Sequence, residues 1–93
     1  MTSPRRVVIL SPAERFIARA SGGERSAIAR KLRNIAADPY IYGEVKFALP
    51  FPPIILTVFY DGEHAITYST PDNNTVSIKS IVDARDFRDQ LYR

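Results

Sequence analysis

Hydrophobic and polar positions follow one period in the first part of this chain and another in the second, which predicts helices followed by strands. The β-branched run Arg5 to Leu10 predicts a short first strand. A helix then begins at Ser11-Pro12, with Ser11 as its cap and Glu14 reaching back to the N–H of the cap. The sequence Ser21-Gly22-Gly23 ends this helix.

A longer amphipathic helix is predicted from about Glu24 to Asp38-Pro39, where the residue before proline leaves the helical region. Its apolar stripe has the spacing of one helix face and comprises Ala27, Ile28, Lys31, Leu32, Ile35 and Ala36. The opposite face carries Arg25, Arg30 and Arg33. This face is either a solvated surface or a docking surface for an acidic protein or for RNA.

The second half of the chain predicts a three-strand meander and a short terminal helix. The proline-rich and aromatic stretch from Tyr40 to Pro53 is interpreted as an irregular surface connection. Asp61-Gly62 and the segment from Pro71 to Asn74 are the two turn signals. The predicted strands and helix are Ile54 to Tyr60, Glu63 to Thr70, Thr75 to Val82, and Ala84 to Arg93.

The order of these elements defines the expected fold class. We expect an α+β fold in which two N-terminal helices pack on a small, mainly antiparallel sheet of about four strands, in the order β-α-α-β-β-β with a short C-terminal helix. The 93 residues are enough for one hydrophobic core, so residues 1–93 are interpreted as a single domain.

The sheet register decides which residues face the helices. A two-residue turn at Asp61-Gly62 would pair Phe59 with His64 and Val58 with Ala65. By count of apolar residues, the face with Val58 and Ala65 should meet the helices. His64, Tyr68 and Lys79 would then share the open face, although a slip of one residue would invert every assignment.

Composition narrows the chemistry. The net charge is +3, and ten of the thirteen basic residues are arginines, which suits planar contacts to phosphate or carboxylate. No cysteine and a single histidine exclude a Cys-based zinc site and a His-rich site, so no cofactor or metal is expected. Prolines interrupt the longest apolar run and the N-terminus lacks a signal-peptide pattern, so we expect a cytoplasmic protein without a membrane segment.

From Val7 to Tyr92 the chain resembles the RelE/ParE superfamily, the toxins of bacterial type II toxin–antitoxin pairs. The resemblance lies in the Ser-Pro-Ala helix start, the basic helix that ends in Asp-Pro, the Gly43-x-x-Lys46 connection and the meander that ends near Arg85-Asp86. It implies growth arrest by a toxin that an acidic antitoxin neutralises.

The resemblance also implies a set of site residues. Members that cleave mRNA on the ribosome use basic and tyrosine side chains to activate a ribose 2′-hydroxyl, stabilise the phosphate and protonate the leaving oxygen. Lys46 matches the lysine that follows the second helix, and Arg85 resembles the arginine after the last meander strand. Tyr92 lies close to the position of the terminal tyrosine in these members, although its spacing from Arg85 is one residue too long. With His64 as a base or acid, these are the four candidate catalytic residues.

One departure from the family concerns the strand after the Asp-Gly turn. Many members have Gly-Asp-Tyr-Arg there, whereas this chain has Gly62-Glu63-His64-Ala65. Loss of such an arginine removes a contact worth roughly 3–4 kcal/mol in the transition state. In the family's register position 65 faces the site and His64 enters the core. In the count-based register, His64 and Lys79 face the site and compensate for the missing arginine.

Three functions therefore remain open. The chain is an mRNA endonuclease that acts with the ribosome, or a ParE-like inhibitor that binds DNA gyrase without catalytic side chains, or a non-toxic antitoxin-binding relative or unrelated small binding domain. RNA cleavage is placed slightly ahead of gyrase inhibition. Two of the candidate catalytic residues also have a purely structural interpretation. Arg85 has Asp83 and Asp86 as neighbours for an ion pair, and His64 suits a half-buried strand position.

Overall fold

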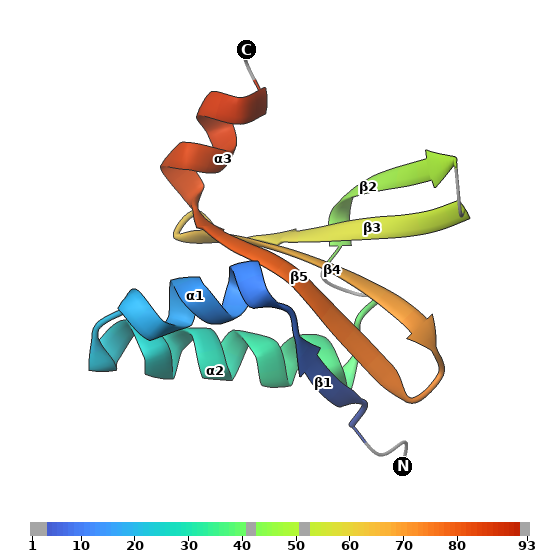
Figure 1. Cartoon of the computed structure of the whole chain (residues 1–93), viewed down its shortest axis with the longest axis horizontal. Helices are drawn as coiled ribbons and strands as arrows, with labels where there is room; N and C mark the ends of the chain where they lie inside the picture. The colour runs from blue at the N-terminus through green and yellow to red at the C-terminus, as the bar shows by residue number, and fades with distance from the viewer. Residues whose placement is uncertain (1–3, 41–42, 51–52, 92–93) are drawn as a thin grey trace.

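The computed structural model describes residues 4–40, 43–50 and 53–91, and it confirms the α+β fold with a short C-terminal helix. Helices α1 and α2 lie together on one side of a twisted sheet, and α3 projects from the end of β5 on the other side (Figure 1). In chain order the elements are β1 (Arg6–Ile9), α1 (Ser11–Arg19), α2 (Gly22–Ala37), β2 (Gly43–Pro50), β3 (Pro53–Tyr60), β4 (His64–Asp72), β5 (Thr75–Asp83) and α3 (Ala84–Leu91).

The sheet has five strands in the order β1-β5-β4-β3-β2. All pairs are antiparallel except β1 with β5, which is parallel because the two helices carry the chain back across the sheet before the meander begins. The first strand therefore lies beside the last, and β5 is held on both edges.

The interpretation of Tyr40 to Pro53 as an irregular connection is wrong for Gly43–Pro50, which is β2. Val45, Phe47 and Leu49 alternate with Glu44, Lys46 and Ala48, the two-residue period of a strand. Pro50 and Pro53 lie at the end of β2 and the start of β3, where a missing N–H interrupts no central ladder. Prolines at the ends of the segment therefore do not prevent it from forming a strand.

The helix boundaries are close to the predicted ones, but the caps differ. Leu10 is the N-cap of α1 without a side-chain hydrogen bond, and Ser11 is already helical, so the expected cap at Ser11 is wrong. Helix α2 begins two residues earlier than predicted, at Gly22. It is capped by Ser21, whose hydroxyl accepts from the Glu24 N–H at 3.2 Å.

Arg25 joins the two helices. Its guanidinium donates to the carbonyls of Ile17 and Ala18 at 3.0 and 2.8 Å, in the last turn of α1, where carbonyls lack their usual helical N–H donors. Helices α1 and α2 are therefore fastened at their junction.

The turn between β3 and β4 is longer than two residues. Within this turn only Gly62 has a positive φ, at 91°, whereas a two-residue type I′ turn needs positive φ at both central positions. Asp61 instead accepts the N–H groups of Glu63 and His64 on one carboxylate oxygen, each at 3.0 Å. Tyr60 consequently pairs with Ala65, two residues away from the predicted register, and a shift of two leaves each side chain on its face.

The face predicted to meet the helices is nevertheless the wrong one, and a β-bulge explains why. The β4–β5 register shifts at Thr67/Tyr68, so Thr67 pairs with Ser80 while Tyr68 pairs with Ile78 and Lys79 is the extra residue. The bulge moves the first half of β5 onto the face that carries Ile66 and Tyr68. That face packs on the helices, with a core of Ala13, Ala20, Ile28, Leu32, Ile35, Phe59, Ile66, Tyr68, Val76, Ile78 and Ile81.

Candidate functional site

A buried lysine lies at the centre of the most connected polar group among the described residues. Lys31 occupies the apolar stripe of α2, which carries it into the protein, where it is 4% exposed. Its Nζ lies 2.7 Å from Asp61 Oδ2, 2.7 Å from His64 Nδ1 and 3.5 Å from Glu63 Oε2. A buried ammonium needs such partners, because an isolated one would lose its hydration without compensation.

His64 is held from both sides of its ring. It is 3% exposed at the start of β4, with Nδ1 on Lys31 and Nε2 3.0 Å from Glu24 Oε2, and the Phe16 ring packs against it edge-on. An ammonium group donates hydrogen bonds and accepts none. Lys31 therefore donates to Nδ1, which leaves the proton on Nε2, where it is donated to Glu24. We call Glu24, Lys31, Asp61, Glu63 and His64 the His64 cluster.

Asp61 provides the negative charge of the turn. Burial raises the pKa of its carboxyl. The hydrogen bond from Lys31 and those from the backbone N–H groups of His64 and Glu63 lower the pKa by more than burial raises it, and the resulting pKa is about 2. The carboxylate is therefore ionised over the physiological range and pairs with the buried ammonium.

Two members of the His64 cluster and the neighbouring Asp83 resemble a metal site only in part. Glu24, His64 and Asp83 each offer a ligand atom, and these atoms lie within 4.8 Å of one another. A divalent metal would need the lone pair of Nε2, yet the donation from Lys31 to Nδ1 leaves the proton on Nε2. A metal would fit only after the imidazole proton moved to Nδ1 and Lys31 turned away to the acidic residues of the turn.

His64 consequently lies in the core, as the family register predicts, and the count-based placement on an open face is wrong for His64 and for Tyr68, which is 1% exposed. Ala65 belongs to the opposite face of β4, where it pairs with Tyr60 and Val82 and is 1% exposed. Position 65 thus offers no polar group on the face where the family arginine would stand.

The other predicted site residues are dispersed. Arg85 lies exposed in the first turn of α3 and lines an open hollow of about 420 Å³ together with Gly62, Glu63 and Arg88. Lys46 lies on β2 opposite Thr57, and its side chain is outside the described part. Tyr92 lies outside the described residues altogether. The described side chains therefore bring no two of the four candidate catalytic residues into contact, and their catalytic role stays a prediction.

Sequence reasoning did not identify Lys31 and Glu24 as partners of His64. The signal for Lys31 was present, since a lysine in the middle of an apolar helix stripe must either reach the surface or meet buried acceptors. The signal for Glu24 was weaker, because a glutamate in the first helical turn is common for reasons of capping alone.

Among the described residues, no helix is long and apolar enough to cross a membrane. Comparison with known proteins adds no assignment, because no protein-family model and no curated protein matches this chain.

Proposed function

We propose that this protein is the toxin of a type II toxin–antitoxin pair, which arrests growth in the cytoplasm by binding its target and is neutralised by an acidic antitoxin. The toxin part of the proposal is supported by the resemblance to the RelE/ParE superfamily and by the order of elements, in which a helix pair precedes an antiparallel meander. Exposed arginines on the two helices, at Arg15, Arg19, Arg30 and Arg33, offer a surface for an acidic partner.

The mode of action is inferred from one observation, the placement of residues 64 and 65. The only histidine has both ring nitrogens occupied by Lys31 and Glu24, and alanine stands on the opposite face. A nuclease site needs a free acid or base and a cation for the phosphate. Action by binding, as in a ParE-like gyrase inhibitor, requires neither and is therefore favoured over RNA cleavage.

RNA cleavage is the second candidate, and one observation favours it. Arg85 and Arg88 are both exposed beside the open hollow at the start of α3, where a phosphate could meet two guanidinium groups. The acidic side chains of Glu63, Asp83 and Asp86 line the same hollow and oppose an anion there.

Induction of the protein without a partner separates these functions. Growth, protein synthesis by pulse labelling, and plasmid supercoiling are measured in parallel, and purified protein is added to a gyrase supercoiling reaction and to ribosomes that carry mRNA. We expect growth arrest with loss of supercoiling while early protein synthesis continues and mRNA stays intact. Uninterrupted growth with both processes normal would refute the toxin proposal.

Substitutions then test the mode of action. If RNA is cleaved, Lys46→Ala and Arg85→Ala should each restore growth and stop mRNA cleavage, while Arg15→Ala, which removes an exposed arginine from α1, should not. If the protein acts by binding, Lys46→Ala should leave gyrase inhibition within about twofold, because no catalytic step depends on it. Circular dichroism melting curves check that every variant is folded.

A further inference from the structure

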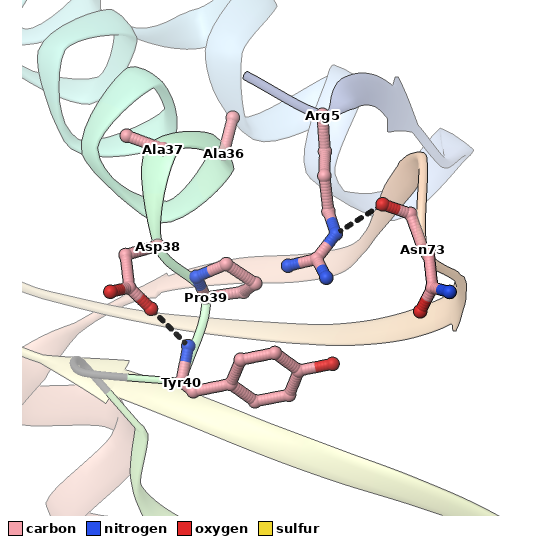
Figure 2. A pocket seen from close by; sticks show the side chains of 7 residues that line it. All are labelled: Arg5, Ala36, Ala37, Asp38, Pro39, Tyr40 and Asn73. Atoms are coloured by element: carbon pink, nitrogen blue, oxygen red, sulfur yellow. Dashed lines mark hydrogen bonds between the residues drawn. The ribbon is translucent and has the colours of Figure 1, made fainter. Parts of the chain in front are cut away.

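A small hollow lies where the end of α2 meets the turn between β4 and β5, away from the His64 cluster. Its volume is about 220 Å³, and it is lined by Arg5, Ala36, Ala37, Asp38, Pro39, Tyr40 and Asn73 (Figure 2). Pockets that enclose drug-sized ligands are larger, about 300–1,000 Å³, so a ligand of that size would fill this hollow with one group and extend onto the exposed surface beside it.

Hydrogen bonds hold Arg5 in the hollow but engage only part of its guanidinium group. Its backbone N–H donates to Ala36 O at 3.1 Å, and its Nε donates to the Asn73 carbonyl at 2.9 Å. Within the described part of the chain, the two terminal nitrogens of the guanidinium have no hydrogen bond or ion pair. Four N–H donors of a positioned cation therefore have no partner among residues 4–40, 43–50 and 53–91, and they suit an anionic group.

Tyr40 adds a flat aromatic surface beside this cation. Figure 2 shows its ring below the Arg5 guanidinium. The guanidinium carbon is 5.1 Å from the ring centroid, yet Tyr40 is still 65% exposed. An exposed tyrosine ring next to an arginine is the arrangement on which unpaired bases stack in single-strand binding proteins.

The backbone beneath Tyr40 is held in place. The Tyr68 hydroxyl donates to the Pro39 carbonyl, and one carboxylate oxygen of Asp38 accepts the Tyr40 N–H at 3.2 Å. The ring is thus presented by a segment tied to both β4 and α2, which lowers the entropy lost when a ligand binds.

We propose that this hollow binds one nucleotide of a single-stranded nucleic acid, with the base on the Tyr40 ring and the phosphate on the Arg5 guanidinium. An acidic peptide is a poorer fit, because it would use the guanidinium alone and leave the ring without a partner. Double-stranded nucleic acid is a poorer fit too, since its bases are already stacked. The proposal does not rest on the toxin function, and either can fail without the other.

Fluorescence anisotropy of labelled oligonucleotides tests the proposal with the full chain. The probes are RNA and DNA single strands about eight nucleotides long, with the same mixed sequence, and the matching duplex, at low and physiological salt. We expect single strands to bind more tightly than the duplex. Preference for the RNA strand over the DNA strand would identify RNA as the source of the nucleotide, and equal binding would show that only base and phosphate are read.

Variants locate the binding. Tyr40→Ala should weaken single-strand binding at least about fivefold, whereas Tyr40→Phe, which keeps the ring, should stay near the parent. Arg5→Ala should weaken it about tenfold, and Arg15→Ala, which removes the same charge from α1, less than about twofold. Asp38→Asn keeps an acceptor for the Tyr40 N–H while it removes a negative charge, and it should tighten binding.

Three results would overturn the proposal. The first is equal affinity for duplex and single strand, and the second is an equal loss from Arg5→Ala and Arg15→Ala, since both would indicate a general attraction to the basic surface. The third is binding of an oligoglutamate peptide that depends on Arg5 but not on Tyr40, without binding of single strands. Unchanged melting temperatures of the variants keep these results separate from misfolding.

Discussion

At the scale of single residues, Lys31 joins α2 to the turn between β3 and β4. Its ammonium contacts the Asp61 carboxylate at 2.7 Å and the buried ring of His64 at 2.7 Å, so one charge holds together two segments that are about thirty residues apart in sequence, α2 and the 61–64 stretch. Removal of one partner from a buried charged group leaves the others without compensation, which destabilises a protein more than replacement of the whole group does.

Substitution of Lys31 by methionine keeps the length of the side chain and removes its charge. We expect the free energy of unfolding to fall by about 3 kcal/mol, because His64 Nδ1 loses its donor inside the protein and Asp61 loses its cation. Arg30→Met, at the exposed neighbouring position, should change it by less than about 0.5 kcal/mol.

Urea unfolding measures the free energy of unfolding of the Lys31→Met and Arg30→Met variants. A decrease below about 1 kcal/mol for Lys31→Met would show that the buried ammonium is not a major source of stability. Because His64 is the only histidine, its ¹⁵N resonances are unambiguous in the parent protein. They should show the tautomer with the proton on Nε2.

Asp61 makes stability depend on pH in the acid range. Its pKa falls from 3.8 to about 2 on folding, so its contribution is fully present above pH 3.8 and is lost as the pH falls through about 2. We expect Asp61→Asn to be less stable than the parent by about 1 kcal/mol at pH 7, a value reduced by the exposure of the carboxylate, and the difference to vanish near pH 2.

Urea unfolding at pH 7, 4 and 2 follows this difference. Asparagine still accepts the two backbone N–H groups of the turn, so the variant isolates the charge. Glu63→Gln is the matched control, because its carboxylate is 72% exposed and lies 3.5 Å from Lys31. A difference for Asp61→Asn that persists at pH 2 would show that the carboxylate charge is not the cause.

At the scale of elements, the turn between β3 and β4 depends on Gly62. Its φ of 91° is one that residues with a side chain rarely adopt, although a Cβ there would meet no atom within 4 Å. Gly62→Ala should therefore destabilise the protein by about 1 kcal/mol through the backbone alone.

Gly23→Ala provides the opposite case. Gly23 lies in the first turn of α2, a Cβ there also meets nothing within 4 Å, and its backbone is helical, so alanine should stabilise by about 0.5 kcal/mol. Thermal unfolding of both variants gives the comparison. Shifts of the same sign would argue against a backbone origin.

The helices and strands also differ in how well the sequence pattern predicted them. Helix α2 was predictable because its apolar stripe and the Asp38-Pro39 stop agree, and the terminal helix was predictable from the spacing of Phe87 and Leu91. β2 was missed because prolines at its end outweighed an alternating pattern. The helix-facing side of the sheet was assigned wrongly because the bulge at Lys79 depends on strand pairing, which a count of apolar residues does not include.

The candidate site was less predictable than the fold for the same reason. The His64 cluster unites residues from α2, the turn and β4, and their contacts follow from a register that local sequence does not determine. The lysine in the apolar stripe was the one local sign of it.

At the scale of the whole molecule, β4 and β5 form the centre of the fold. They lie inside the sheet order, and most of their residues from Ala65 to Tyr68 and from Thr75 to Ile78 are buried. Helix α3, in contrast, is attached to the sheet by buried Ala84 and by the Phe87 ring, whose centroid is 5.7 Å from that of Tyr60.

Amide hydrogen exchange should therefore be slowest in β4 and β5 and require global unfolding there, while α3 exchanges earlier through local opening. Residue-resolved NMR exchange in mild denaturant measures these opening free energies. Equal protection of α3 and β5 would mean that the terminal helix belongs to the same cooperative unit.

The parallel pairing of β1 with β5 also affects how the protein is made. Val7 and Ile9 acquire their partners only with Val76 and Ile78, so the first strand of the chain waits for the last one to be synthesised. Contacts between such distant segments slow folding, because the loop between them must close first. A chain still on the ribosome and not yet extended through β5 therefore has no partner for β1, and its sheet is incomplete until residues 75–83 have been made.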